Sequence, residues 1–186
     1  MEVQFPRQLL LVKHTEGARA VMTLTQQEPD GLWSEVLTAP VLIGKNGLTA
    51  HHVEGDMASP LGLYPLGTAF STEPAVPFAY PCRTITGDSW WVDDPASPLY
   101  NSWVECSGRQ GFASGEHLAD TPVHYHYGLV VEYNTSPVTP GRGSAIFIHC
   151  KGDKPYTHGC VAMEEDVMLR VLHWLDAEKH PCVLFG

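Results

Sequence analysis

The pattern of hydrophobic residues along the chain predicts a fold made mainly of β-strands. Near the N-terminus, short runs rich in apolar and β-branched residues are separated by the turn sequences EPDG and GKNG. Later in the chain, YGLVVEY and SAIFIHC combine β-branched with aromatic residues, which favours strands, and CVLFG ends the sequence. We therefore expect strands at residues 8–13, 20–25, 32–37, 41–43, 127–133, 144–150 and 182–186.

One segment near the C-terminus shows convincing helical periodicity. Apolar side chains recur there at the i, i+3, i+4 and i+7 spacing that places them on one face of a helix. They are Met168, Val171, Leu172 and Leu175. Acidic residues at 164–166 suit the positive end of a helix dipole, and Pro181 stops the chain beyond the helix. The expected fold is mainly β, a β-sandwich or mixed sheet with one helix at residues 164–178 packed on it.

The middle of the chain, residues 54–114, is dominated by Gly, Pro, Ser and Asp. Its stretches SPLGLYPLGTAF and SWWVDDPASPLYNSW are interpreted as loops and short strands that lie over a core. The sequence has no internal repeat, low-complexity tract or obvious linker. We therefore expect a single domain over residues 1–186.

Composition and charge argue against several classes of partner. The formal net charge of −10 disfavours nucleic acid, whose phosphates need a basic surface, and disfavours anionic membrane surfaces. No stretch approaches the roughly 20 apolar residues of a membrane-spanning helix. The opening sequence MEVQFPRQLLLVKH has an apolar run of four residues and no small-residue cleavage site, so we do not expect a signal peptide there. Either the protein stays inside the cell or the sequence lacks its leader.

The stretch IHCKGDKPYTHGC, residues 148–160, concentrates the candidate chemistry. A thiol nucleophile needs a nearby imidazole, backbone N–H groups for an oxyanion, and an exposed turn. Cys160 follows Gly159, which permits a tight turn, and it precedes the expected helix, whose dipole would favour a thiolate. His149 ends an expected strand, and the loop 151–156 can return the chain to it. His158 is the competing base.

Two other interpretations of this stretch stay open at this point. A cysteine in an apolar sequence is often a small buried hydrophobe with no chemical role. Zinc is the second alternative, since His149, Cys150, His158 and Cys160 are all possible ligands. Neighbouring residues of a strand point to opposite faces, however, so His149 and Cys150 would not easily share one ion.

The run GSAIFIHC followed by THGCVAM resembles the signature of the YkuD-type L,D-transpeptidase family. The stretches IGKNGL, EGDMASPLGLYPLG, WWVDDPASPLYN and VVEYNT extend the resemblance over roughly residues 41–186. The resemblance implies a mainly β fold with a catalytic groove, and an activity that builds or remodels bacterial peptidoglycan. By position it makes Cys160 the nucleophile and His149 the general base, with Thr157, His158 and Gly159 as the supporting loop and oxyanion environment.

The sequence departs from the family pattern at three points around these residues. His149 precedes Cys160 by a shorter loop than is usual. Ala162 stands where Arg or Asn is common, and Cys150 stands where Gly usually follows the base histidine. These differences leave thiol chemistry intact and leave the acyl donor, and hence the crosslink, open.

Aromatic and polar residues upstream are candidates for a peptide-binding groove, because aromatic rings stack along extended chains and polar tips fix their backbone. The candidate substrate-binding residues are Arg83, Trp91, Asp93, Tyr100, Tyr133 and Asn134. Glu54 and Asp56 are candidates for the cationic end of a diaminopimelate side chain. For each of them a role in the core or in a surface turn is the competing explanation.

Taken with the resemblance, these residues predict a cysteine acyltransferase of the bacterial periplasm or cell envelope that makes peptidoglycan crosslinks and so bears on cell shape. Cys160 forms a thioester with a stem peptide, and a side-chain amine of a second stem takes the acyl group. Peptidoglycan stem peptides are the expected partners, and no metal, organic cofactor, nucleic acid or membrane insertion is expected. The alternatives are an L,D-carboxypeptidase or endopeptidase that uses water, a wall-binding module with inert Cys160, and a zinc hydrolase.

Overall fold

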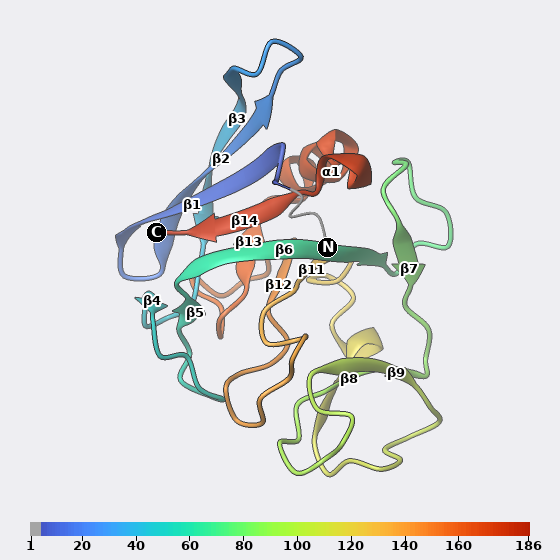
Figure 1. Cartoon of the computed structure of the whole chain (residues 1–186). Helices are drawn as coiled ribbons and strands as arrows, with labels where there is room; N and C mark the ends of the chain where they lie inside the picture. Colours follow the sequence, from blue (N-terminus) through green and yellow to red (C-terminus); the bar gives the residue numbers. More distant parts are fainter. Residues whose placement is uncertain (1–4) are drawn as a thin grey trace.

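The computed structural model describes residues 5–186 and is built mainly from β-strands (Figure 1). Residues 1–4 of the N-terminal segment lie outside the described residues. The strands are β1 (Gln8–Glu16), β2 (Arg19–Gln27), β3 (Trp33–Leu42), β4 (Leu48–Thr49), β5 (Ser59–Pro60), β6 (Gly62–Ser71), β7 (Cys82–Thr84), β8 (Ser89–Val92), β9 (Ser102–Glu105), β10 (Gly115–His117), β11 (Tyr127–Val131), β12 (Phe147–Cys150), β13 (Val161–Met163) and β14 (Cys182–Phe185). The helices are α1 (Glu165–Trp174) and two short 3-10 helices, η1 (Leu118–Asp120) and η2 (Ala177–Lys179).

The main sheet is mixed and closes on itself. Its nine strands follow the order β11-β12-β13-β3-β2-β1-β14-β6-β7, and β11 also pairs with β6 near the other end. This extra pairing joins the two ends of the sheet and encloses one core. The parallel pairs β1–β14 and β12–β13 lie among antiparallel neighbours. The expected mainly β fold with a mixed sheet is therefore confirmed.

The main core follows from the alternation of apolar residues along the strands. On β1, Leu10 and Val12 are almost fully buried, and on β2, Met22 and Leu24 face the same interior. Because successive strand residues point to opposite faces, the residues between them reach the outer side. The apolar run near the N-terminus thus forms a core strand, and each such side chain contributes roughly 1.5–3 kcal/mol by leaving water.

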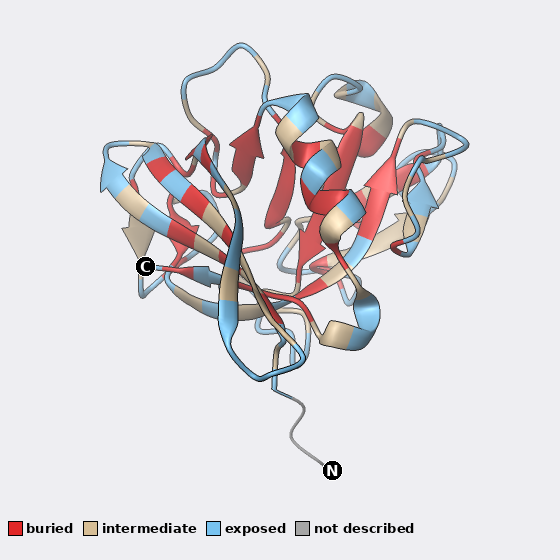
Figure 2. Cartoon of the chain, turned by 90° about the horizontal axis from the view of Figure 1, so that it is seen from above, coloured by how far each residue is buried: buried red, intermediate tan, exposed pale blue. Residues whose placement is uncertain are grey.

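Helix α1 packs on this core with the face that its sequence predicts. Met168, Val171 and Leu172 are fully buried among the residues of the main core. Figure 2 shows the buried residues concentrated on the strands next to the helix, whereas the outer turns of α1 are exposed. No helix in residues 5–186 is long and apolar enough to cross a membrane.

A second, smaller sheet lies beside the outer face of the main one. It has three antiparallel strands in the order β10-β8-β9, which Figure 1 shows below the main sheet. A second apolar cluster fills the space between the two sheets, and its largest members include Phe70, Trp91, Tyr125 and Phe147. Cys160 packs against this cluster. The outer face of β12 is therefore covered, which creates a wall for a site.

Two predictions about strands in the first half of the chain are wrong. Residues 32–37 and 41–43 belong to one continuous strand, β3, which runs through Pro40. Proline is tolerated there because β13 pairs with β3 only at Leu42, so most of that edge is open. Likewise, residues 62–71, expected as loops and short strands over a core, form the long strand β6 inside the main sheet. Gly67 sits in this strand because a Cβ there would collide with the Glu132 carboxylate, not because the chain turns.

The C-terminal helix is shorter than expected, since it ends at Trp174 and not near residue 178. Leu175 adopts an extended conformation, and the Asp176 side chain accepts a hydrogen bond from the Glu178 N–H to start η2. The Asp176 backbone N–H donates to Gln8 Oε1 at 2.8 Å. A contact with the distant first strand thus interrupts a pattern that is locally helical.

Candidate active site

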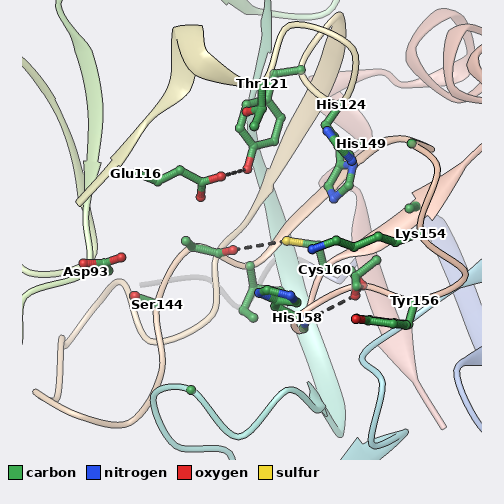
Figure 3. Close-up of a pocket in the computed structure, with 18 of the residues that line it drawn as sticks. Asp93, Glu116, Thr121, His124, Ser144, His149, Lys154, Tyr156, His158 and Cys160 are labelled. Atoms are coloured by element: carbon green, nitrogen blue, oxygen red, sulfur yellow. Dashed lines mark hydrogen bonds between the residues drawn. The ribbon is translucent and has the colours of Figure 1, made fainter. Parts of the chain in front are cut away.

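A cavity of about 500 Å³ opens between the main sheet, the small sheet and the loop after β4. Its lining residues come from distant parts of the chain, and Figure 3 draws most of them. Those with polar or reactive side chains are His52, Glu54, Asp93, Glu116, Thr121, His124, Tyr125, Ser144, His149, Lys154, Tyr156, Thr157, His158 and Cys160. Segments far apart in the sequence therefore supply the walls, and the candidate thiol lies among them.

Cys160 and His149 are brought to the same face by two neighbouring parallel strands. The register of β12 and β13 pairs Ile148 with Val161 and His149 with Ala162. Cys160 immediately precedes β13 and so lies diagonally from His149 on the cavity side. Ile148 and Val161 point the other way into the main core. Ala162, the residue that departs from the family pattern, lies opposite His149 in the ladder and lines the cavity.

The Cys160 sulfur is held by backbone groups of the neighbouring segment. Its Sγ donates to the Ala145 carbonyl at 3.3 Å and accepts from the Phe147 N–H at 3.4 Å. Burial raises the pKa of the thiol to about 12, the charge of Glu116 adds to the rise, and the Phe147 N–H lowers it less. The resting group is therefore a neutral thiol at physiological pH.

The expected stabilisation of a thiolate by the helix is wrong. The short strand β13 separates Cys160 from α1, which begins only at Glu165. A helix dipole acts within about one turn of its end, so the positive end of α1 does not reach the sulfur. Deprotonation must instead come from a base in the cavity.

His149 is buried, and its ring is neutral with a defined tautomer. Nδ1 lies 2.8 Å from the Cys150 carbonyl, which can only accept, so Nδ1 carries the proton. Burial lowers the pKa of His149 to about 4, outweighing the carbonyl contact that raises it, and His124 lowers it further. Nε2 then has a free lone pair. Within residues 5–186 we find no hydrogen bond between His149 and the Cys160 thiol.

The turn that carries the thiol is fixed by Thr157 and Ser59. Thr157 Oγ1 donates to the Cys160 carbonyl at 2.6 Å and accepts from the Gly159 N–H at 3.2 Å. Ser59 Oγ, fully buried, donates to the Gly159 carbonyl at 2.6 Å. Gly159 has φ of 152°, and a Cβ there would lie 3.0 Å from the Ala58 carbonyl oxygen. The turn is thus built for glycine.

This geometry changes the expected oxyanion environment. The Gly159 N–H is taken by Thr157, so it does not point freely into the cavity. The N–H groups of His158 and Cys160 donate no hydrogen bond to another residue in the part of the chain that the structure describes. Those two groups are the better candidates for the oxyanion.

His158 occupies the exposed side of the cavity. Its ring stacks on Tyr156 with centroids 6.2 Å apart and planes 15° apart. The side chain lines the cavity near Cys160 (Figure 3) but makes no hydrogen bond to the thiol among the described residues. A general base needs a fixed side-chain rotamer. Packing fixes the rotamer of buried His149 much more strongly than that of exposed His158.

Of the six candidate groove residues, the cavity lining includes Asp93 and not the other five. Trp91 is buried and donates from Nε1 to Asn101 Oδ1, while Arg83 lies over the Trp103 ring beside a separate hollow of about 300 Å³. Tyr100 is buried, and its hydroxyl donates to the carboxylate of Glu54, which lines the cavity. Asn101, in the same PLYNSW stretch, joins these segments because its amide also donates to the carbonyls of Tyr133 and Asn134.

Tyr133 and Asn134 serve the fold of the neighbouring loop. The Tyr133 hydroxyl donates to the Arg142 carbonyl at 2.6 Å, and its ring packs edge-on against His52 and Tyr64. Asn134 has φ of 52°, and its side chain bonds the backbone of Thr139 and Gly143. Their polar atoms are therefore used inside the loop that forms the cavity rim.

Several cavity residues were missed from the sequence. Glu116 comes from β10, and its carboxylate accepts from the buried Tyr125 hydroxyl. His52 lies with Nδ1 2.8 Å from Asp56 Oδ1, and Lys154 reaches the rim from the loop after β12. The HHVEGD stretch was a signal for the His52 region. Nothing in SGEHLAD marks Glu116 as a site residue.

Metal-ligating side chains do not converge in this region. No group of three or more His, Cys, Asp or Glu side chains within residues 5–186 is placed to hold a metal ion. Cys150 faces the core and donates to the Tyr127 carbonyl at 3.5 Å, whereas His149 faces the cavity. The two neighbours thus point apart, as strand alternation requires.

The chain is similar to a known protein family and to a solved structure. The family model YkuD, described as an L,D-transpeptidase catalytic domain, matches residues 19–182. Comparison with curated proteins gave no match. Among solved structures, the chain is similar to the helical cell shape determining protein Pgp2 from Campylobacter jejuni, with 16% identity and a TM-score of 0.49. That alignment covers 96% of this chain and 47% of the other, so the chain spans about half of that structure's length.

Proposed function

Because the chain belongs to the YkuD family of L,D-transpeptidase catalytic domains, we propose that it is a cysteine acyltransferase that crosslinks peptidoglycan. The donor is a stem peptide whose L-to-D peptide bond is attacked by Cys160. The acceptor is a side-chain amine of a second stem. The whole domain, residues 1–186, serves as one catalytic unit, and no metal or organic cofactor takes part.

One observation carries this proposal. His149 on β12 and Cys160 just before β13 lie on the cavity side of two adjacent parallel strands, while their strand neighbours Ile148 and Val161 point into the main core. The ladder of β12 and β13 fixes the positions of both residues, so no flexible loop is needed to bring them to one face of the cavity. An inert wall-binding module would not require a thiol and a neutral imidazole at the floor of one cavity.

The acylation step follows from the protonation states. Neutral His149 has its Nε2 lone pair available, since Nδ1–H is committed to the Cys150 carbonyl. As the sulfur turns from the Ala145 carbonyl to the substrate, Nε2 takes the thiol proton and the sulfur attacks the peptide carbonyl. The N–H groups of His158 and Cys160 hold the oxyanion. His149 then gives its proton to the leaving D-alanine amine, leaving a thioester.

The thioester is resolved by an amine. The amine nitrogen attacks the thioester carbon, the C–S bond breaks, and the thiolate regains a proton through His149. This chemistry places the protein in the bacterial periplasm or cell envelope, where peptidoglycan lies. Its partners are peptidoglycan stem peptides.

Intact-protein mass spectrometry and muropeptide analysis test the proposal. Wild-type protein incubated with a tetrapeptide donor is expected to gain the acyl mass on Cys160 and to release D-alanine. Cys160→Ala should fold normally and give neither product. His149→Gln should slow acylation by about 10²–10⁴, the range for a positioned proton transfer, whereas His158→Gln should lose less. Wild-type turnover in Cys160→Ala, or the reverse order of the two histidine variants, would contradict the assigned roles.

A further inference from the structure

Asp93 has an unused carboxylate at the cavity wall. It follows β8 in the small sheet and lines the same cavity as Cys160. Its Oδ1 is shielded from solvent and has no hydrogen-bond partner in residues 5–186. The adjacent Asp94 behaves differently, because its carboxylate accepts from the N–H groups of Ala96 and Ala113. A shielded carboxylate without a donor is costly, so Asp93 suits a ligand that brings one.

Glu116 supplies a second negative group beside Asp93. Its carboxylate accepts one hydrogen bond from the Tyr125 hydroxyl, which leaves acceptor capacity for a ligand. Burial raises the pKa of Glu116, the Tyr125 contact lowers it, and the charge of Asp93 raises it again. Two carboxylates in mutual repulsion are stabilised by a cation placed between them.

Thr121 completes the set of acceptors. Its Oγ1 lines the cavity, is shielded from solvent and has no hydrogen-bond partner among the described residues. A primary ammonium has three N–H donors, and Asp93, Glu116 and Thr121 offer three oxygen acceptors. The third cavity carboxylate, Glu54, is already bonded by Tyr100 and Ser144.

Acidic side chains of the cavity and basic ones lie on opposite sides of the thiol. Figure 3 shows Asp93 and Glu116 on the side of Cys160 that is opposite to His149 and Lys154. An incoming cation is therefore attracted to the wall formed by Asp93, Glu116 and Thr121, and is kept apart from the lysine. Besides burial, the charge of Glu116 raises the pKa of the Cys160 thiol, so an amine held at this wall lies near the sulfur.

We propose that Asp93, Glu116 and Thr121 bind the ammonium group of the amine acceptor and so decide that an amine, and not water, resolves the thioester. This inference rests on the proposed function, because it assumes that Cys160 becomes acylated. Asp93 and Glu116 are the specificity-determining residues for the second half of the reaction.

The transfer step balances with these groups. The bound ammonium first gives one proton to the Glu116 carboxylate, and its nitrogen lone pair attacks the thioester carbon. The C–N bond forms, the C–S bond breaks, and the bonding electrons go to the Cys160 sulfur. A second nitrogen proton passes through His149 to the sulfur, and the amide keeps the third. Glu116 then releases its proton to solvent.

The test separates acylation from transfer in Asp93→Asn, Glu116→Gln and a control, Asp88→Asn. Asp88 is an exposed carboxylate before β8 that does not belong to the cavity lining. A synthetic tetrapeptide ending in D-alanine serves as donor, and a tripeptide with a free side-chain amine serves as acceptor. Acyl-enzyme formation is followed by intact mass, and chromatography gives the ratio of amide product to hydrolysed product at several acceptor concentrations.

Both cavity variants are expected to lose at least about tenfold in the amide-to-hydrolysis ratio, because a charge-assisted contact is lost. Neither variant should acylate much more slowly than wild type, and Glu116→Gln should acylate somewhat faster, because, besides burial, the Glu116 charge raises the pKa of the Cys160 thiol. The KM for the acceptor should rise, the KM for the donor should not, and Asp88→Asn should match wild type. Unchanged ratios and acceptor KM in both variants would overturn the inference while leaving Cys160 acylation intact. A wild type that gives only hydrolysis would overturn it too. No acyl-enzyme in the wild type would overturn the proposed function itself. Urea midpoints check folding, and Asp93→Asn, which lies outside the strands and helices, keeps the test valid if Glu116→Gln does not fold.

Discussion

Acidification should destabilise the protein through His149, and the size of the effect can be worked from the structure. The imidazole is 6% exposed, and burial lowers its pKa to about 4 from the ordinary 6.5. Between these values the unfolded chain binds a proton that the folded chain does not. The stability that neutral His149 contributes is therefore present above pH 6.5 and is lost as the pH falls toward 4. One pKa unit corresponds to about 1.4 kcal/mol, so the loss reaches about 2 kcal/mol at pH 5 and about 3 kcal/mol at pH 4.

Urea unfolding at pH 7.5, 5 and 4 measures this effect in wild type and His149→Gln. Glutamine does not titrate, so the variant should lose about 3 kcal/mol less than wild type on going to pH 4. Other groups, including Glu116, titrate in both proteins and largely cancel in the comparison. His158→Gln makes the same chemical change at an exposed position and should follow wild type.

A direct measurement accompanies the unfolding curves. The His149 ring proton resonances in an NMR titration should show a midpoint near pH 4. If the stability difference between wild type and His149→Gln stays constant from pH 7.5 to 4, the ring is not buried in its neutral form. The argument that His149 rests as a free base in the cavity would then be wrong.

Two further predictions follow from the thiol and its turn. Alkylation of Cys160 by iodoacetamide, followed by peptide mass spectrometry, should be slow at neutral pH. Its rate should rise about tenfold per pH unit up to about pH 10, because the pKa of the thiol is raised to about 12. A plateau of the rate below pH 8 would contradict a resting neutral thiol. Thr157→Val keeps the shape of the side chain but removes the hydrogen bonds to the Cys160 carbonyl and the Gly159 N–H. Urea unfolding should therefore show that the free energy of unfolding falls by about 2 kcal/mol. A decrease below about 0.5 kcal/mol would mean that the turn does not depend on these hydrogen bonds.

Some features of the fold are determined locally and were visible in the sequence. Runs rich in apolar, β-branched and aromatic residues predicted β1, β2, β11, β12 and β14, and the 3.6-residue period predicted the buried face of α1. Period and turn residues act over a few neighbouring positions, so no knowledge of the tertiary structure was needed. Successive side chains of a strand point to opposite faces, which explains why His149 and Cys150 point apart.

Other features were hidden because distant partners decide them. Strand β6 contains Pro65 and Gly67, which locally favour a turn, yet the strand is stabilised by pairing with β14, β7 and β11. Helix α1 ends early because Asp176 bonds to Gln8 at the other end of the chain. In both places tertiary hydrogen bonds override the local preference of the backbone.

The site divides in the same way. The sequence by itself predicted a site with the thiol, the two histidines and the turn glycine, because these residues lie within thirteen positions of one motif. Only the tertiary structure brought Glu116 and Thr121 into one cavity with Asp93 and Cys160. It also placed Trp91, Tyr133 and Asn134 outside the cavity lining and separated the thiol from α1 by β13. Charge and burial depend on neighbours in space, so the neutral states of Cys160 and His149 emerge only when the two sheets enclose the cavity.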